Sequence, residues 1–241
     1  MRKVIKGIAA SKGIVIAKAY KLEELNLEVN DIISGAIEEE IALVSKVFSD
    51  TINQLDDIYK TALVKLGEEE ASVFEAHKAI VLDPELKTQV EEKIKTGISA
   101  PKALEVVTDT FVAMFESMDD EYFKARAADI KDVRKRLIAK SLGLSLPSLA
   151  EIKEEVIVIA EDLTPSETSQ LDANFTLGFI TNIGGRTSHA AIMARSMEIP
   201  AVVGTGEIMS ASDGDVIILN AITGEIIINP SEEDIKKANV E

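Results

Sequence analysis

The hydrophobic pattern of this 241-residue chain changes its period twice, and that change limits the fold more than any other feature. The first twenty or so residues alternate as strands do, on both sides of a turn at residues 11–13. From about Ser34 the apolar side chains recur every three or four residues, as on one face of a helix, and short strand-like runs return from Glu155. Strands at both ends therefore predict one sheet that the first and last strands share, with the helices inserted between them.

Five helical stretches are predicted within the insertion. Two of them begin at or near a proline, and the last one ends at Gly143, which are typical helix boundaries. They are a long amphipathic helix from about Ser34 through Tyr59, one through residues 74–81, one from about Pro84, one from near Pro101, and one from about Asp120 to Leu142. We expect an all-helical bundle over residues 30–145 and an α/β subdomain made of residues 1–22 and 146–235.

The last third of the chain predicts parallel β-strands. Short apolar runs at residues 156–159, 176–181 and 201–203 are separated by helical stretches, which is the pattern of βαβ units with right-handed crossovers. Residues 216–219 and 225–228 then form two runs around Thr223 and Gly224, the pattern of a hairpin. The fold class predicted from the sequence is α/β with an all-α insertion.

Composition excludes several classes of function. The chain has 42 acidic and 26 basic residues, a formal charge of -16, which argues against a nucleic-acid partner and favours one with a positive face. It has no cysteine and only two histidines, so neither a disulfide nor a metal site is expected. No apolar run approaches the roughly 20 residues of a membrane span, so we expect no membrane association and a cytoplasmic location.

Residues 184–195 are the segment that says most about chemistry. Two glycines permit a tight turn, Thr187 or Ser188 can cap the helix that follows, and His189 then lies in its first turn. Free N–H groups and a partial positive charge at a helix start favour a phosphate bound to the imidazole and disfavour an imidazolium. This geometry suits a phosphohistidine at His189, with Gly185, Arg186, Thr187 and Ser188 as neighbours of the phosphate, but a histidine at a helix start is more often a capping or packing residue, so the segment alone leaves both roles open.

A second helix start supports this interpretation. Thr164, Pro165 and Glu167 form a capping-box pattern directly after the predicted strand 156–159, as the helix of His189 follows its own strand. In a parallel sheet both helix starts lie at the same edge, where ligands usually bind. We expect Thr168, in the first turn, to hydrogen-bond the His189 ring and orient it.

Residues 184–189, continued by 192–196 and 199–204, resemble the phosphohistidine signature of enzymes that use phosphoenolpyruvate. Those enzymes include Enzyme I of the bacterial phosphotransferase system, pyruvate phosphate dikinase and phosphoenolpyruvate synthase. Residues 7–11, 126–132 and 162–168 resemble Enzyme I in particular, and the similarity covers essentially the whole chain. Lys12 stands where that family usually has proline, and Arg134 where glycine is expected.

The resemblance implies a phosphohistidine swivelling α/β subdomain with an inserted helical subdomain that binds HPr, the small phosphocarrier protein. It implies a phosphoenolpyruvate-protein phosphotransferase in which His189 accepts phosphate on Nε2 and passes it to a histidine of HPr. The phosphoenolpyruvate and Mg²⁺ sites of this family lie in a C-terminal barrel. From this we expect an isolated, monomeric N-terminal fragment that lacks the barrel and needs no cofactor, whereas the full-length enzyme would be a homodimer.

The resemblance also implies an HPr contact surface on the inserted helices. Its expected contact residues are Glu68, His77, Leu82, Glu85 and Arg126. Their acidic bias suits a positive partner and would mainly speed encounter.

The role of Arg195 in phosphate binding is left open. It lies six positions beyond His189 and points elsewhere on an ideal helix, so a structural role is favoured for it. Contact of the phosphate with Arg186 or with Arg195 is not decided by the sequence.

Two other interpretations stay open. The chain could be the swivelling domain of a dikinase or synthase, carrying phosphate between two distant active sites, and HPr binding would separate that case from Enzyme I. It could also be a catalytically silent module that docks HPr through its acidic helical face, and in that case no phosphoryl exchange would occur.

Overall fold

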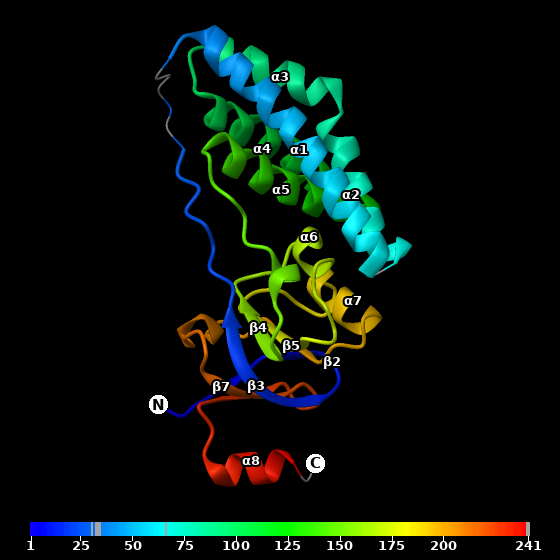
Figure 1. The fold of residues 1–241 in the computed structure, drawn as a ribbon, viewed down its shortest axis with the longest axis vertical. Coiled ribbons are helices and arrows are strands. Elements are labelled where there is room, and N and C mark those ends of the chain that lie inside the picture. The colour runs from blue at the N-terminus through cyan, green and yellow to red at the C-terminus, as the bar shows by residue number, and fades with distance from the viewer. Residues whose placement is uncertain (30, 32–34, 66, 240–241) are drawn as a thin grey trace. The chain divides into compact units, whose positions relative to one another are not determined.

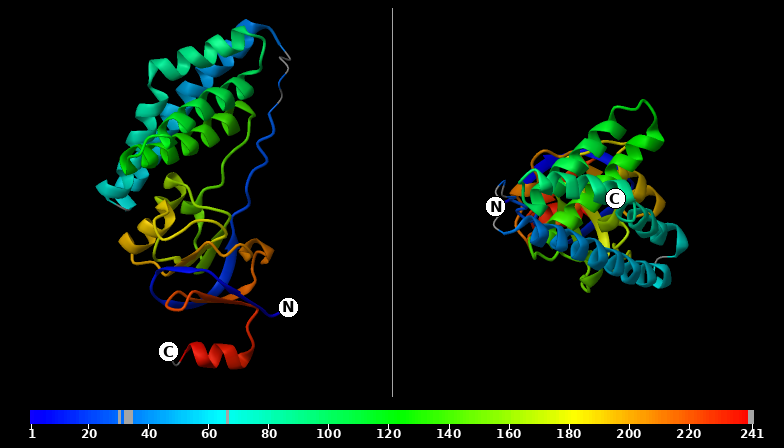
Figure 2. Two further views of the ribbon diagram at one scale, coloured as in Figure 1. Left: turned by 180° about the vertical axis from the view of Figure 1, so that it is seen from behind. Right: turned by 90° about the horizontal axis from the view of Figure 1, so that it is seen from above.

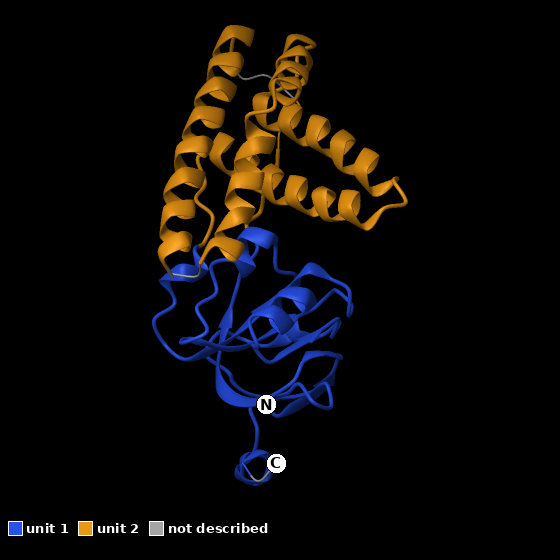
Figure 3. Cartoon of the chain, turned by 90° about the vertical axis from the view of Figure 1, so that its right-hand side faces the viewer, with its two compact units in different colours: residues 1–24, 148–241 blue, residues 25–147 orange. Residues whose placement is uncertain are grey.

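A computed structural model describes the chain except for residues 30, 32–34, 66 and 240–241. The chain forms two compact units, shown in separate colours in Figure 3. One, the sheet unit, combines residues Met1–Glu24 with Ser148–Glu241, and the other, the helical unit, spans Leu25–Pro147. The domain boundary expected at residue 30 lies outside the described residues.

The sheet unit is built on one eight-stranded sheet in the order β1-β8-β7-β3-β4-β5-β6-β2 (Figure 1). Strands β3 to β6 are parallel neighbours, whereas β1 pairs antiparallel with β8 and β2 with β6. The predictions of a shared sheet, parallel central strands and a final hairpin are confirmed. The strands are β1 Lys3–Lys6, β2 Ile8–Ser11, β3 Ile14–Lys21, β4 Val156–Ala160, β5 Thr176–Thr181, β6 Ala201–Val203, β7 Val216–Asn220 and β8 Glu225–Ile228.

Both faces of the sheet are packed. Every residue of β4 is buried, and its side chains alternate between two hydrophobic clusters, as the two-residue period of a strand requires. Val158 packs on the face that also receives Ala190 and Ala194 of helix α7 (His189–Ser196), and Ile157 packs on the opposite face. The small alanines bring α7 close to the sheet, which fixes the position of His189 at the start of that helix.

Within its described residues, the helical unit contains five helices, as the periodicity predicts. They are α1 Ile37–Lys65, α2 Glu68–Val81, α3 Pro84–Lys95, α4 Ala100–Glu116 and α5 Glu121–Ser141. The start predicted near Ser34 lies outside the described residues. Asp83 and Asp120 cap α3 and α5 by accepting hydrogen bonds from backbone N–H groups, and Phe74, Leu104 and Leu137 belong to one buried apolar cluster.

The described part of the sheet unit contains three further short helices besides α7 and α6 (Pro165–Thr168). They are two 3₁₀ turns at Leu149–Glu151 and Ile208–Ser210, and α8 (Glu232–Ala238), which follows β8 and is seen from behind in Figure 2. Arg2, just before β1, forms an ion pair with Asp234 of α8. Among the described residues, no helix is both long and apolar enough to cross a membrane.

Candidate functional site

His189 is the first residue of α7, and the side chain of Ser188 caps this helix. The Ser188 hydroxyl oxygen accepts a hydrogen bond from the Ala191 N–H at 3.3 Å, so Ser188 rather than Thr187 is the cap. The His189 side chain is half-buried. The helix start therefore holds the imidazole beside backbone N–H groups that the helix itself does not use.

The loop that leads into α7 depends on a close approach of two backbone segments. Gly184 has a φ of 109°, and Gly204, just after β6, has a φ of 66°. A Cβ atom on Gly204 would lie 2.5 Å from the Gly184 carbonyl oxygen, so only glycine fits there. Gly185 continues the turn by accepting a hydrogen bond from the Ser188 N–H at 3.0 Å.

Thr168 meets the His189 ring, as the sequence predicts. It ends α6 (Pro165–Thr168), whose start is a complete capping box between Thr164 and Glu167. Its side chain is fully buried, and its Oγ1 lies 3.0 Å from His189 Nε2. The two helix starts after β4 and β5 thus bring a hydroxyl and an imidazole into hydrogen-bond contact.

The same hydroxyl also lies 3.0 Å from the Pro165 carbonyl oxygen and 3.2 Å from that of Thr164. A threonine hydroxyl has one proton, so it either donates to a carbonyl and accepts from a protonated Nε2, or donates to an unprotonated Nε2. In both cases Thr168 engages the nitrogen that the family resemblance assigns to the phosphate. A role of Nε2 in attacking a phosphoryl group would require it to leave Thr168 first.

Arg195 braces the loop rather than the His189 ring. Its guanidinium donates to the Ala10 carbonyl oxygen at 3.3 Å and to the Arg186 carbonyl oxygen at 3.1 Å. This gives Arg195 a structural role, the role that its spacing favoured. The side chains of Arg186 and Thr187 are exposed beside it.

Acidic side chains lie beside α6. Partial desolvation raises the pKa of Asp162, and the nearby charges of Glu167, Glu161 and Glu24 raise it further, while the Leu163 N–H opposes this. Within the described part of the chain, no three His, Asp or Glu side chains gather as a metal site would require.

Four of the five residues expected to contact HPr have exposed or partly exposed side chains. Glu68, Leu82 and Glu85 are exposed, and the Arg126 side chain is 37% exposed. Glu68 and Leu82 lie at the two ends of α2, roughly 20 Å apart at 1.5 Å per residue. A surface that uses both residues would extend along the whole helix.

His77 differs, because it lies in the interior with no exposed surface. Its Nε2 lies 3.0 Å from an Asp129 carboxylate oxygen, and its Nδ1 lies 3.9 Å from Asp132. Asp129 also pairs with Arg126 at 3.5 Å, and the Arg126 guanidinium stacks 5.1 Å from the centre of the Tyr122 ring. His77 is thus placed to support Arg126 through Asp129, and a partner would reach it only if its cover moved.

Asp129 and Asp132 were not among the site residues predicted from sequence. The signal was present in part, since Asp129 follows Arg126 by three positions on a predicted helix, where side chains are neighbours. The contact between Asp129 and His77 of α2 had no local signal in the sequence.

Comparisons with known proteins show the family of the chain. A family model described as PEP-utilising enzyme, N-terminal, matches residues 6–126, and one described as PEP-utilising enzyme, mobile domain, matches residues 152–224. The phosphoenolpyruvate-protein phosphotransferases of Listeria monocytogenes and Priestia megaterium are 50% and 48% identical to this chain, over 98% of its length. The chain spans only 41% and 42% of the length of those relatives.

A solved structure gives the same result for the fold. An NMR solution structure of Enzyme I superposes with a TM-score of 0.84 and 42% identity, covering 98% of this chain and 97% of that one. The sheet with its inserted helices is thus the architecture of the N-terminal domain of Enzyme I. The chain belongs to the family of phosphoenolpyruvate-utilising enzymes and, within it, to Enzyme I, the phosphoenolpyruvate-protein phosphotransferase.

Proposed function

We propose that His189 is a reversible phosphoryl carrier that exchanges a phosphoryl group with a histidine of HPr. The observation that carries the proposal is the position of its imidazole at the start of α7, with Nε2 3.0 Å from Thr168 Oγ1. In the full-length enzyme the phosphoryl group would come from phosphoenolpyruvate. Ligands for Mg²⁺ would have to lie outside the described residues, among which no three His, Asp or Glu side chains gather around one point.

The exchange needs only a nucleophile that is aligned with the phosphorus atom of the donor. The lone pair of Nε2 attacks the phosphorus of phospho-HPr in line, a P–N bond to His189 forms, and the P–N bond to the donor imidazole breaks. The donor ring keeps the electron pair of the broken bond, and the same step in reverse returns the phosphoryl group to HPr. The phosphoryl group passes through a loose, metaphosphate-like transition state, for which the protein supplies alignment and charge stabilisation.

Residues around His189 suit each stage of this cycle. Thr168 holds the free ring by its Nε2, which keeps the side chain in one orientation until a donor arrives. After release from Thr168, the phosphorylated ring lies beside the first N–H groups of α7, which favour negative charge. Arg186 is exposed in the preceding loop, where its charge adds to the attraction.

The exposed acidic residues at the ends of α2 and α3 are proposed to dock HPr. Glu68 and Glu85 provide negative charge, Leu82 provides an apolar surface that is 55% exposed, and Arg126 is held by Asp129. Charges at the rim of an interface mainly raise the association rate and select the partner. The chain itself is proposed to work as a monomer.

The test is incubation with phospho-HPr followed by phosphorus NMR of the separated chain. The chain has two histidines, so a phosphohistidine signal has only two possible origins. We expect a signal in the native chain and in His77→Asn, and none in His189→Ala. A signal that survives in His189→Ala would refute the assignment of the carrier residue.

Two further outcomes separate the alternatives. A folded native chain that binds HPr but takes no phosphate would indicate the silent docking module, and one that does not bind HPr would favour a dikinase-type domain. Phosphoenolpyruvate alone should not label the chain. Rapid labelling by phosphoenolpyruvate would contradict the assignment of its site to another domain.

A further inference from the structure

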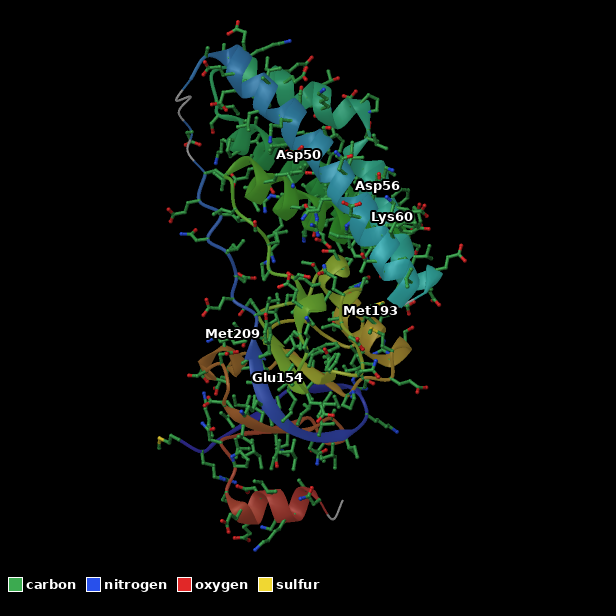
Figure 4. The ribbon with its side chains drawn as sticks, viewed as in Figure 1. Asp50, Asp56, Lys60, Glu154, Met193 and Met209 are labelled. Atoms are coloured by element: carbon green, nitrogen blue, oxygen red, sulfur yellow. The ribbon has the colours of Figure 1, made fainter. Side chains whose placement is uncertain are left out.

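A pocket of about 540 Å³ lies in the sheet unit, walled by the β2–β3 turn, the β7–β8 turn, α7 and the loop before it. This volume falls in the range of sites for small organic molecules, about 300–1,000 Å³. Figure 4 labels Met193 on α7, and Arg195 follows in the last turn of that helix. His189 does not line the pocket, and of the residues proposed above to act in phosphoryl exchange the pocket shares Arg186.

Three cations from different segments line this pocket. They are Lys12 from the β2–β3 turn, Arg186 from the loop before α7, and Arg195. Among the described residues, none of the three forms an ion pair with a carboxylate, whereas Lys3, Lys102 and Arg134 elsewhere do. Against these three cations the pocket is lined by one carboxylate, that of Glu198, so its charged side chains leave a net positive charge that attracts an anion, in a chain whose formal charge is -16.

Arg195 is fixed in place by the backbone. Its two terminal nitrogens each donate to a carbonyl oxygen, one of Ala10 and one of Arg186. A guanidinium has five N–H groups, so three donors remain after these two bonds. A side chain that is already ordered loses little conformational entropy when it binds a ligand, which favours binding.

We propose that this pocket binds a small phosphate monoester that carries free hydroxyl groups. Cations that arrive from three segments suit a tetrahedral, doubly charged phosphate better than a flat, singly charged carboxylate. Glu198 also lines the pocket and would repel the phosphate, but its carboxylate can accept hydrogen bonds from the hydroxyl groups of the ligand. Ala10, Ala221 and Ile222 offer an apolar surface for the carbon skeleton.

Lys12 makes the proposal specific to this chain. It is the position at which the sequence departs from the proline that the resemblance leads one to expect. It lies outside the proposed phosphoryl-transfer residues, so changing it alters the pocket without touching the carrier site. The binding itself does not rest on the proposed function.

The test is a titration of the ¹⁵N-labelled chain with glycerol 3-phosphate, followed by NMR. We expect saturable shifts of the amides of residues 9–12 and 221–222. Shifts are also expected in residues 184–188, because Arg195 holds the Arg186 carbonyl. Lys12→Gln should weaken binding about tenfold, the loss expected for one charge-assisted contact. Lys153→Gln, an exposed lysine before β4 that does not line the pocket, should leave the affinity unchanged.

Two control ligands show which parts of glycerol 3-phosphate the pocket recognises. Inorganic phosphate should bind more weakly than glycerol 3-phosphate, and glycerol should not bind. Absence of saturable shifts, equal affinity for inorganic phosphate, or unchanged affinity in Lys12→Gln would each overturn the proposal. The titration is repeated with His189→Ala, which should bind equally well, so a failure of phosphoryl exchange leaves this result intact.

Discussion

Replacing Gly204 with alanine tests whether the close backbone approach beside the phosphohistidine loop is needed for function. Ordinary contact with a Cβ atom begins at 3.4 Å, and the new Cβ would lie 2.5 Å from the Gly184 oxygen. That oxygen must therefore retreat by about 0.9 Å (3.4 − 2.5). Gly184 lies four residues before Ser188, the cap of α7, so the displacement falls on the loop that presents His189.

Gly206 provides a matched control. Its φ of 68° is close to the 66° of Gly204, but a Cβ atom there meets nothing within 4 Å. Both substitutions place an L-residue in the left-handed region, which costs about 1–2 kcal/mol of folding free energy. Only Gly204→Ala adds overlap with the backbone, which costs about 1–3 kcal/mol more.

Urea denaturation measures the free energy of unfolding, and the rate of phosphate exchange with phospho-HPr measures function. Gly206→Ala should lose only the free energy of unfolding that the left-handed conformation costs, about 1–2 kcal/mol, and should keep its exchange rate. Gly204→Ala should lose the cost of the left-handed conformation and that of the backbone overlap. Its exchange rate should fall roughly 10- to 100-fold, since a shift near 1 Å in the loop that positions the reacting His189 ring has an effect of that size. Equal stability losses in the two variants, or full exchange activity in Gly204→Ala, would refute the reasoning.

Three further predictions concern polar and charged residues. His77→Ala removes the buried imidazole that hydrogen-bonds Asp129 and leaves a cavity, so it should lower the free energy of unfolding by about 3 kcal/mol in urea. A loss below about 1 kcal/mol would contradict the supporting role. Arg126→Glu should weaken HPr binding at least roughly tenfold, measured by calorimetry. Lys46→Glu on α1 makes the same charge change outside the predicted surface and should have little effect. Equal effects of the two variants would contradict the interface assignment. Asp162→Asn should stabilise the chain near pH 7 but not near pH 3. The pKa of Asp162 is raised above 3.8 in the folded chain, so the folded state loses stability as the pH rises through that pKa and the carboxyl becomes charged, and asparagine avoids this loss. Thermal unfolding at both pH values checks this.

Local patterns predicted most of the fold correctly because local physics decides it. The capping box at Thr164 and the alternating period of the strands depend only on neighbours in sequence, and the structure contains both. Likewise, the two helix starts after parallel strands predicted that Thr168 and His189 would meet. Which ring nitrogen meets the hydroxyl depends on rotamers and on distances across the sheet, and the sequence carries no signal for these.

The burial of His77 shows how a visible signal can be misjudged. The buried residues of α2 are Ala71, Phe74, His77 and Val81, spaced by three and four positions. His77 therefore lies on the apolar stripe of its own helix, and this spacing predicts burial. Its expected place on the surface came from the family resemblance. The partner that makes burial of an imidazole tolerable, Asp129, lies 52 positions away and has no local signal.

The order of the strands has a consequence for how the chain acquires its structure during synthesis. Lys18 of β3 pairs with Val156 of β4 only after the whole helical unit has been translated, and Lys3 of β1 waits for Ile228 of β8. The helices make mostly local contacts and can form as they leave the ribosome, whereas the sheet must hold its first strands unpaired until the last ones arrive. We therefore expect the loop before His189 to become structured late, when the helices of the helical unit have already been translated.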